Sequence, residues 1–189
     1  MSAVTAVPFL DLSTAFKALE AEWLETIRAS GAKGSFILGP QTVEFEKEFA
    51  QYVGVKHAIG VANGTDSLVL SLRALGIGPG DEVITTPWTF FASAESISIV
   101  GATPVFVDIR PDTYCLDPDS IVKRLTPKTR AIMPVHIFGH AADMDAIMQI
   151  AKDRKLAVVE DCAQSFGARS SGKVTGAIGD TGSFSFYPT

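Results

Sequence analysis

The first third of the chain carries apolar residues at helical spacing. Within residues 13–29, four large apolar side chains recur every three or four positions with charged residues between them, which predicts an amphipathic helix with Ser13 as its N-cap. These side chains are Phe16, Leu19, Trp23 and Ile27. Residues 31–40 then break the pattern with three glycines and a proline, and a second helix is expected from Pro40 or just after it. Its apolar positions are Val43, Phe45, Phe49 and Val53.

From residue 56 onward, short apolar runs alternate with amphipathic stretches. The runs that predict strands are residues 56–62, 81–87, 103–109, 130–136, 156–161 and 183–187. The stretches that predict helices are residues 65–76, 90–101 and 142–155. This alternation is typical of an α/β fold with a mostly parallel sheet and helices on both faces. The strands are continuous apolar runs, as expected when both of their faces are covered.

Composition and charge narrow the functional classes. Lysine and arginine number 16 against 21 acidic residues, for a formal net charge of −5, and no basic cluster is present. Because nonspecific nucleic-acid binding requires a basic face, we expect no nucleic-acid partner, although a local site could hold a phosphate-bearing small molecule. The two cysteines, Cys115 and Cys162, are too few for a disulfide scaffold. Without an apolar run of about 20 residues or a signal-peptide pattern, we expect a soluble cytoplasmic protein with no membrane span.

Ligands of parallel α/β sheets bind beyond the carboxyl ends of the strands, and residues 62–68 occupy such a place. Asn63 and Gly64 form a tight turn, and Thr65 and Asp66 open the following helix. The free N–H groups of a helix N-terminus bind phosphate readily. An ordinary N-cap explains the same residues equally simply, so the pattern alone favours the N-cap.

Two further residues lie at predicted strand ends. Trp88 follows a strand and could cover a flat ring, since aromatic stacking adds roughly 0.5–1.5 kcal/mol beyond burial, or it could simply fill the core. Ser183, directly after a glycine, could donate its hydroxyl to an anion or be a plain turn serine. His136 follows a strand as well, but a lone histidine is more often structural.

A third strand end carries two acids. The apolar run 156–159 leads directly into Glu160 and Asp161, and a carboxylate at the end of a buried strand is costly unless it is paired. A protonated ring nitrogen is a suitable partner and would lower the carboxyl pKa by about 1–3. Gln164, three residues on, can both donate and accept a hydrogen bond. The alternative is that one acid caps the next turn while the other faces solvent.

Several motifs occur together in an order that resembles one family. They are NGTDSL at residues 63–68, PWTFFAS at 87–93, EDCAQSFGA at 160–168 and GSFSFYPT at 182–189, accompanied by GSFILGPQTVEFE at 34–46 and PVHIFGHAADMD at 134–145. The set resembles the pyridoxal-phosphate (PLP)-dependent sugar aminotransferases of the DegT/DnrJ/StrS group, within fold type I. The resemblance covers nearly the whole chain from Phe9 onward. Co-occurring motifs in one order are far more specific than any single motif.

The resemblance implies a role for each matching residue. The cofactor phosphate would lie at Gly64, Thr65 and Asp66 and would also contact Ser183. The indole of Trp88 would stack on the pyridine ring, Asp161 would pair with the ring nitrogen, and Gln164 would bond the phenolic oxygen. Many members of the family carry histidine where this chain has Phe166, to which we assign no chemical role.

The resemblance also implies what surrounds these residues. The family's Schiff-base lysine comes directly after the position that matches Thr189, so residues 1–189 are expected to comprise an N-terminal segment and most of the PLP-binding large domain, without the small C-terminal domain. Members work as homodimers with shared active sites. The implied reaction transfers an amino group, with glutamate as the expected donor, to a nucleotide-linked keto sugar. A sugar dehydratase of the same family and a non-catalytic sensor or binding module are the alternatives.

Overall fold

A five-stranded sheet forms the body of the protein, whose computed structural model describes residue 8 and residues 10–187. The strand order is β2-β1-β3-β4-β7, and every neighbouring pair is parallel. The strands of this sheet are β1 (Glu82–Thr85), β2 (Thr103–Phe106), β3 (Thr129–Ile132), β4 (Ala157–Asp161) and β7 (Thr181–Ser183). A small antiparallel ribbon is formed by β5 (Arg169–Ser170) and β6 (Lys173–Val174).

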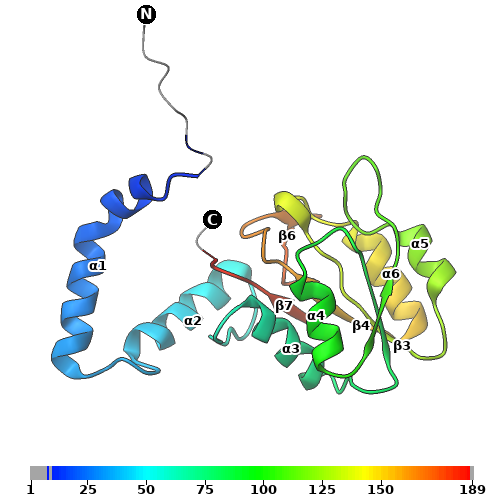
Figure 1. Cartoon of the computed structure of the whole chain (residues 1–189), viewed down its shortest axis with the longest axis horizontal. Helices are drawn as coiled ribbons and strands as arrows, with labels where there is room; N and C mark the ends of the chain where they lie inside the picture. Colours follow the sequence, from blue (N-terminus) through cyan, green and yellow to red (C-terminus); the bar gives the residue numbers. More distant parts are fainter. Residues whose placement is uncertain (1–7, 9, 188–189) are drawn as a thin grey trace, which may run out of the picture.

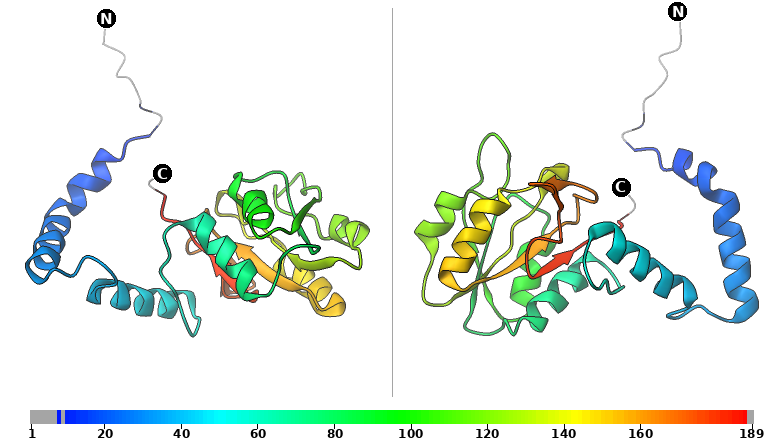
Figure 2. Two further views of the ribbon diagram at one scale, coloured as in Figure 1. Left: turned by 60° about the horizontal axis from the view of Figure 1, so that its bottom comes forward. Right: turned by 180° about the vertical axis from the view of Figure 1, so that it is seen from behind.

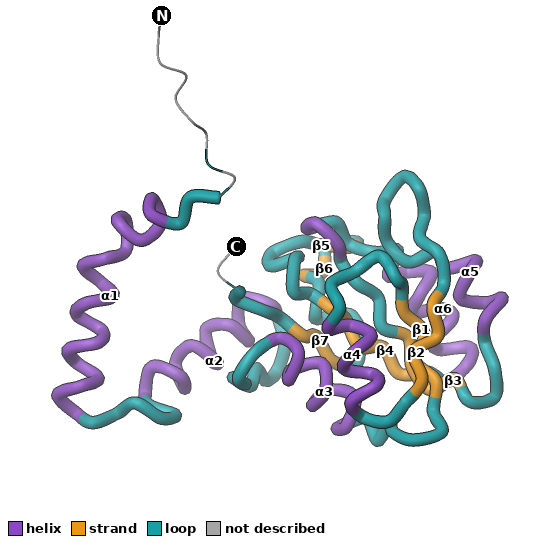
Figure 3. The backbone as a smooth tube through the Cα atoms, viewed as in Figure 1, coloured by secondary structure: helices purple, strands orange, loops and turns teal. Residues whose placement is uncertain are grey.

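Helices cover both faces of the sheet, as predicted (Figure 1). One face packs against α3 (Gly64–Ala74) and α4 (Ala92–Ile99), and the other packs against α5 (Pro118–Arg124) and α6 (Met144–Arg154). A short 3₁₀ turn, η1, spans Ile137–Gly139. Loops, drawn in teal in Figure 3, follow the strands.

The continuous apolar strands follow from this double covering. Val83 and Val159 belong to the α3/α4 core, whereas their neighbours Ile84 and Val158 belong to the α5/α6 core. All four side chains are fully buried. Because successive residues of a strand point to opposite faces, each strand of this kind must be apolar at every position, and the expected α/β fold is confirmed.

The two N-terminal helices lie outside this body. Helix α1 (Ser13–Lys33) buries none of its residues, and α2 (Pro40–Val53) buries only Ala50 and Val53. Figures 1 and 2 show α1 standing clear of the sheet and its helices. Among residues 10–187, none of the helices combines the length and apolarity that a bilayer crossing demands.

Three details of the predicted elements are wrong. Residues 56–62 form no strand, because no described strand lies beside them to complete a ladder; instead the N–H of Gly60 donates to Glu46 Oε1 at 2.6 Å. The last strand covers Thr181–Ser183 rather than 183–187. Ser13 is the first helical residue and not the N-cap, and its N–H donates to Asp11 Oδ1 at 2.8 Å.

The two edges of the sheet differ. On β2, the N–H groups of Thr103 and Val107 donate to β1 residues or their neighbours, so Pro104, which lies between them, turns its nitrogen outward. On β7, the opposite edge, Thr181 keeps a buried hydroxyl for which the described residues offer no hydrogen-bond partner. Helix α5, which the sequence pattern did not predict, begins at Pro118 after Asp117 caps it by accepting from the N–H groups of Asp119 and Ser120.

Candidate active site

The carboxyl ends of the parallel strands bring the candidate residues to one side of the sheet. Asp161 is the last residue of β4 and Ser183 is the last residue of β7, and the two are register partners. Ser183 Oγ in turn donates to the main-chain oxygen of Gly64, at 3.3 Å, where α3 begins. The structure therefore joins three of the predicted stretches, although they are up to 119 positions apart in the chain.

Asp161 is a buried carboxylate without a cationic partner among the residues that hydrogen-bond it. It is 5% exposed, and it lies on the α3/α4 side of the sheet. Oδ2 accepts from Ser93 Oγ at 2.7 Å, and Oδ1 accepts from the N–H of Ala163 at 3.2 Å. Burial raises the pKa of Asp161 despite these hydrogen bonds. Such a group favours a positively charged partner that arrives with a ligand.

The N-terminus of α3 combines a conventional cap with free amides. Asn63 Oδ1 accepts from the N–H of Asp66 at 2.8 Å, so the capping interpretation is confirmed. The N–H groups of Gly64 and Thr65 have no acceptor within the described residues. A Cβ on Gly64 would lie 2.9 Å from the Cβ of Ser185, so the backbone here is close to the segment after β7. Two free amides suit a phosphate group, and the Ser183 hydroxyl can join them by turning from the Gly64 oxygen.

Trp88 lies at the surface above this region rather than in the core. Its side chain is 48% exposed, which rules out the interpretation of a core plug. The main-chain N–H of Trp88 donates to Thr86 Oγ1 at 3.0 Å, and the indole centroid lies 6.2 Å from the ring centroid of Tyr114. The adjacent Thr89 shares a 2.8 Å hydrogen bond with Ser93, the partner of Asp161. The indole is thus free to cover a flat ligand.

Gln164 is oriented by a backbone group that sequence reasoning missed. Its Oε1 accepts from the N–H of Phe138 at 2.9 Å, and its side-chain amide therefore remains available as a donor. Phe138 has a left-handed φ of 53° within η1, which aims this N–H at Gln164. Nothing in the local sequence indicates a contact that spans 26 positions.

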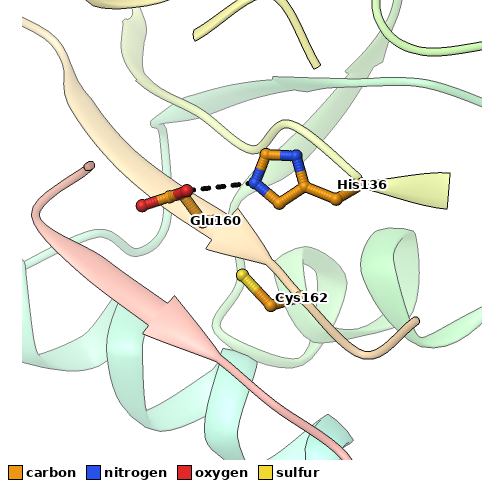
Figure 4. A group of neighbouring side chains, drawn as sticks. All are labelled: His136, Glu160 and Cys162. Carbon is orange, nitrogen blue, oxygen red and sulfur yellow. Dashed lines mark hydrogen bonds and ion pairs between the residues drawn. The ribbon is translucent and has the colours of Figure 1, made fainter. Parts of the chain in front are cut away.

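Glu160 points to the other face of the sheet and contacts a different set of groups. It is fully buried, as is His136, and the His136 Nε2 to Glu160 Oε2 distance is 3.0 Å (Figure 4). Burial by itself raises the pKa of Glu160, but the hydrogen bonds from His136 and from three main-chain N–H groups hold the pKa below its ordinary value. Asp161 does cap the following turn through the Ala163 N–H, as one half of that alternative expected, but neither acid faces solvent, so the other half is wrong. The structural interpretation of His136 is confirmed.

Two neighbouring features belong to packing. Phe166 stacks on Tyr52 with ring centroids 4.9 Å apart, in keeping with the absence of a chemical role.

A groove of about 1000 Å³ lies between residues 55–64, α2 and the segment around β7. Its lining includes Gly64 but neither Asp161 nor Trp88. The candidate site and this groove therefore share only the α3 N-terminus and the segment around β7.

The sequence interpretation also missed Ser93 and Thr89. Their spacing of four positions places both hydroxyls near the start of α4, and Ser93 is fully buried. The sequence shows only that Ser93 lies near the start of a predicted helix. Its hydrogen bond to Asp161, 68 positions away, is visible only in the tertiary structure.

Taken together, the donors of this site fit a planar, phosphate-bearing cofactor with a basic ring nitrogen, in an α/β fold of the fold type I transferase class. Free amides at a helix N-terminus suit the phosphate, a half-exposed indole suits the ring, and a buried carboxylate suits the nitrogen. The chain belongs to the DegT/DnrJ/EryC1/StrS aminotransferase family, whose model matches residues 17–189.

Named relatives are similar over nearly the whole chain. A dTDP-3-amino-3,4,6-trideoxy-alpha-D-glucose transaminase from Streptomyces venezuelae is 49% identical over 182 residues, which are 96% of this chain and 48% of that protein. A UDP-N-acetyl-3-dehydro-alpha-D-glucosamine 3-aminotransferase from Acidithiobacillus ferrooxidans is 48% identical over 189 residues, 100% of this chain and 51% of that protein. A "Pleiotropic regulatory protein" from Geobacillus stearothermophilus is 47% identical over 97% of this chain and 49% of its own length. The chain spans about half the length of these relatives.

Solved structures share the fold closely. The structure of S. venezuelae DesV in complex with a ketimine intermediate matches with a TM-score of 0.95 and 48% identity, covering 98% of this chain and 50% of that one. The structure of ntda from Bacillus subtilis, with bound cofactor PMP, matches with a TM-score of 0.86 and 38% identity, covering 92% of this chain and 40% of that one.

Proposed function

We propose that this chain is the cofactor-binding part of a PLP-dependent aminotransferase that acts on the keto group of a nucleotide-linked sugar. The observation that carries the proposal is the buried carboxylate of Asp161. Asp161 is the register partner of Ser183 on β7, and the Ser183 hydroxyl contacts Gly64 at the α3 N-terminus. A ring-nitrogen partner and a phosphate site thus share one edge of the sheet. Two of the relatives named above are sugar aminotransferases in their printed names, which supports the substrate class.

Each residue has a defined task in this proposal. The amides of Gly64 and Thr65, near Asp66, hold the phosphate together with the Ser183 hydroxyl. Trp88 lies against the ring, and Gln164 donates its amide to the phenolic oxygen. Asp161 holds a proton on the ring nitrogen, and the bound PLP then supplies an electron sink for the carbanion that forms at the substrate carbon.

The proposal extends to the rest of the protein. Since the relatives are about twice as long, we include in the proposal a second, smaller domain that follows the 1–189 segment. The Schiff-base lysine is placed directly after Thr189, and Thr189 lies outside the described residues. A homodimer completes each site, and glutamate is the amino donor. The two cysteines, Cys115 and Cys162, are free and buried, which suits a cytoplasmic location. Size-exclusion chromatography with light scattering tests the dimer, and an active monomer would contradict it.

Cofactor titration tests the central proposal. Full-length protein stripped of cofactor should bind PLP with the appearance of a Schiff-base absorption band and then transfer the amino group of glutamate to a nucleotide-linked keto sugar. Asp153→Asn, which removes an exposed acid of α6, is the control. A protein that shows no band and no saturable binding would contradict the proposal.

A binding module without turnover is the second candidate, and the similarity to the Geobacillus regulatory protein favours it. The same titration separates the two functions. Saturable PLP binding without release of 2-oxoglutarate from glutamate, across a panel of nucleotide-linked keto sugars, would indicate the module. Transfer of the amino group would establish the enzyme, and elimination of water from the sugar would indicate a dehydratase instead.

A further inference from the structure

Glu160 occupies a polar centre directly behind the candidate site. It immediately precedes Asp161 on β4 and points to the opposite face of the sheet. Both of its carboxylate oxygens are saturated. Oε1 accepts from the N–H groups of Ile178 and Gly179, each at 2.7 Å, and Oε2 accepts from Gly176 N–H at 2.8 Å and lies 3.0 Å from His136 Nε2.

The first group of these contacts fixes the approach to β7. The main-chain N–H groups of Gly176, Ile178 and Gly179 converge on one carboxylate, so this loop is folded around Glu160. The glycines allow the close approach: a Cβ on Gly179 would lie 2.7 Å from the oxygen of Val158, and one on Gly182 would lie 2.4 Å from the Cα of Gly176. Since Gly182 directly precedes Ser183 in β7, the position of the loop sets the position of the Ser183 hydroxyl.

The second group fixes the turn that orients Gln164. His136 Nδ1 accepts from the N–H of Ala142 at 3.0 Å, so the ring carries its proton on Nε2 and donates it to Glu160. This closes the turn of residues 136–142, which contains Phe138, whose N–H donates to Gln164. The main-chain N–H of His136 also donates to the main-chain oxygen of Asp161 at 3.1 Å.

We propose that Glu160, with His136, is the positioning residue of the cofactor site, holding the segments that carry Asp161, Gln164 and Ser183 in one arrangement from behind the sheet. This inference rests on the proposed function. Neither side chain contacts the ligand surface, because both are fully buried on the α5/α6 side. Their effect on the cofactor is therefore transmitted through the main chain of residues 136–142 and 176–179.

A metal site is the rival interpretation of the same cluster. His136, Glu160 and Cys162 offer ligand atoms within 4.8 Å of one another (Figure 4). A metal ion would need a free imidazole lone pair, but Nδ1 is occupied by the Ala142 N–H and Nε2 carries the proton. A metal would also displace main-chain donors that have no other acceptor. The hydrogen-bond geometry thus favours a positioning role.

The decisive variant is Glu160→Gln in the full-length protein. The amide keeps the size of the side chain but replaces one acceptor oxygen with a donor, which then faces two N–H groups. Because the whole cluster is buried, Glu160→Gln is expected to change both cofactor affinity and the stability of the fold. Ile121→Val, a buried change on the same face of the sheet, is therefore the matched control for lost stability. Cofactor affinity is measured with pyridoxamine phosphate, which binds without a covalent bond.

We expect Glu160→Gln to raise the Kd for pyridoxamine phosphate at least tenfold in protein that is folded by circular dichroism, while Ile121→Val lowers the melting temperature but keeps Kd within twofold. A Kd within twofold of wild type for Glu160→Gln would overturn the proposal. So would a stoichiometric metal ion in the purified wild-type protein that the variant loses. If Glu160→Gln does not fold, the affinity comparison is made with His136→Gln, which should raise Kd at least threefold; an unchanged Kd would again overturn the proposal.

Amide hydrogen exchange gives a readout that does not depend on the cofactor. Glu160→Gln should speed exchange in both residues 136–142 and 176–179, whereas His136→Gln, which keeps a donor for Glu160 but loses the acceptor for Ala142, should speed it mainly in residues 136–142. Exchange unchanged in both segments would refute the coupling. A wild-type protein that binds no pyridoxamine phosphate would refute the proposed function, and exchange then decides separately whether Glu160 holds the two segments.

Discussion

Replacing Asp161 with asparagine in the full-length protein tests the assignment of the ring-nitrogen partner. The change keeps the shape of the side chain and both contacts, if the amide oxygen accepts from the Ala163 N–H and the amide NH2 donates to Ser93 Oγ, whose hydroxyl then acts as the acceptor. It removes only the charge. Because burial raises the pKa of Asp161, the charge is unfavourable in the empty site, and the free energy of unfolding of the cofactor-free variant should equal or exceed that of wild type.

The cofactor-bound protein should respond in the opposite direction. A charge-assisted hydrogen bond contributes about 1.5–3 kcal/mol and a neutral one about 0.5–1.5 kcal/mol. Exchanging one for the other costs about 1–1.5 kcal/mol, or roughly five- to thirteenfold in cofactor affinity. Turnover should fall further, by about 10²–10³-fold, because the variant no longer stabilises the protonated ring when negative charge develops on the substrate carbon.

Two measurements check these magnitudes. Equilibrium titration gives the Kd for PLP, and single-turnover absorbance after mixing with glutamate gives the rate of the first half-reaction. Asp153→Asn provides a control with the same change of charge at an exposed position. A variant of Asp161 with near-normal turnover, or one whose cofactor-free form is much less stable than wild type, would refute the role assigned to this carboxylate.

Three other perturbations follow from the geometry. The folded-state pKa of Glu160 lies below the ordinary value of 4.5. The ionised carboxylate therefore stabilises the fold above pH 4.5, and this stabilisation is lost as the pH falls through the folded-state pKa. Urea unfolding should show Glu160→Gln most destabilised at pH 7 and progressively less below pH 4.5. Ser93→Ala removes a donor that lowers the pKa of Asp161, so cofactor affinity should weaken roughly three- to tenfold, whereas Ser96→Ala, which removes a hydroxyl bonded to a main-chain oxygen, should not change it. Gly182→Ala places a Cβ 2.4 Å from Gly176 Cα and should lower the unfolding free energy by more than ~2 kcal/mol; a smaller loss in calorimetry would mean that the loop can yield.

The sheet was predictable because its strands are buried on both faces. A run such as residues 156–159 is apolar at consecutive positions only if two layers of helices cover it, and that is what β4 shows. Residues 56–62 also resemble a strand in sequence but have no pairing strand among the described residues, so local preference did not become a ladder. A strand depends on its neighbour as much as on its own sequence.

The site was predictable only in part. Asp161, Ser183 and the α3 N-terminus lie together as the rule for parallel strand ends requires. The supporting groups could not be found from the sequence, since Ser93 reaches Asp161 across 68 positions and Glu160 collects donors 16 to 19 positions ahead. Local patterns indicate which residue ends a strand, but not which distant hydroxyl or amide is placed against it.

The unlike edges of the sheet have a consequence for how the protein associates. At β2, the nitrogen of Pro104 faces the open side of the strand and cannot donate a hydrogen bond. Natural sheets use proline in this way to prevent edge-to-edge growth. At β7, the outer side carries no proline or charged residue, and Thr181 has a buried hydroxyl still without a partner in the described part of the chain. Within the described part of the chain, β7 is therefore the less protected edge of the sheet, and an edge of this kind favours pairing with a further strand.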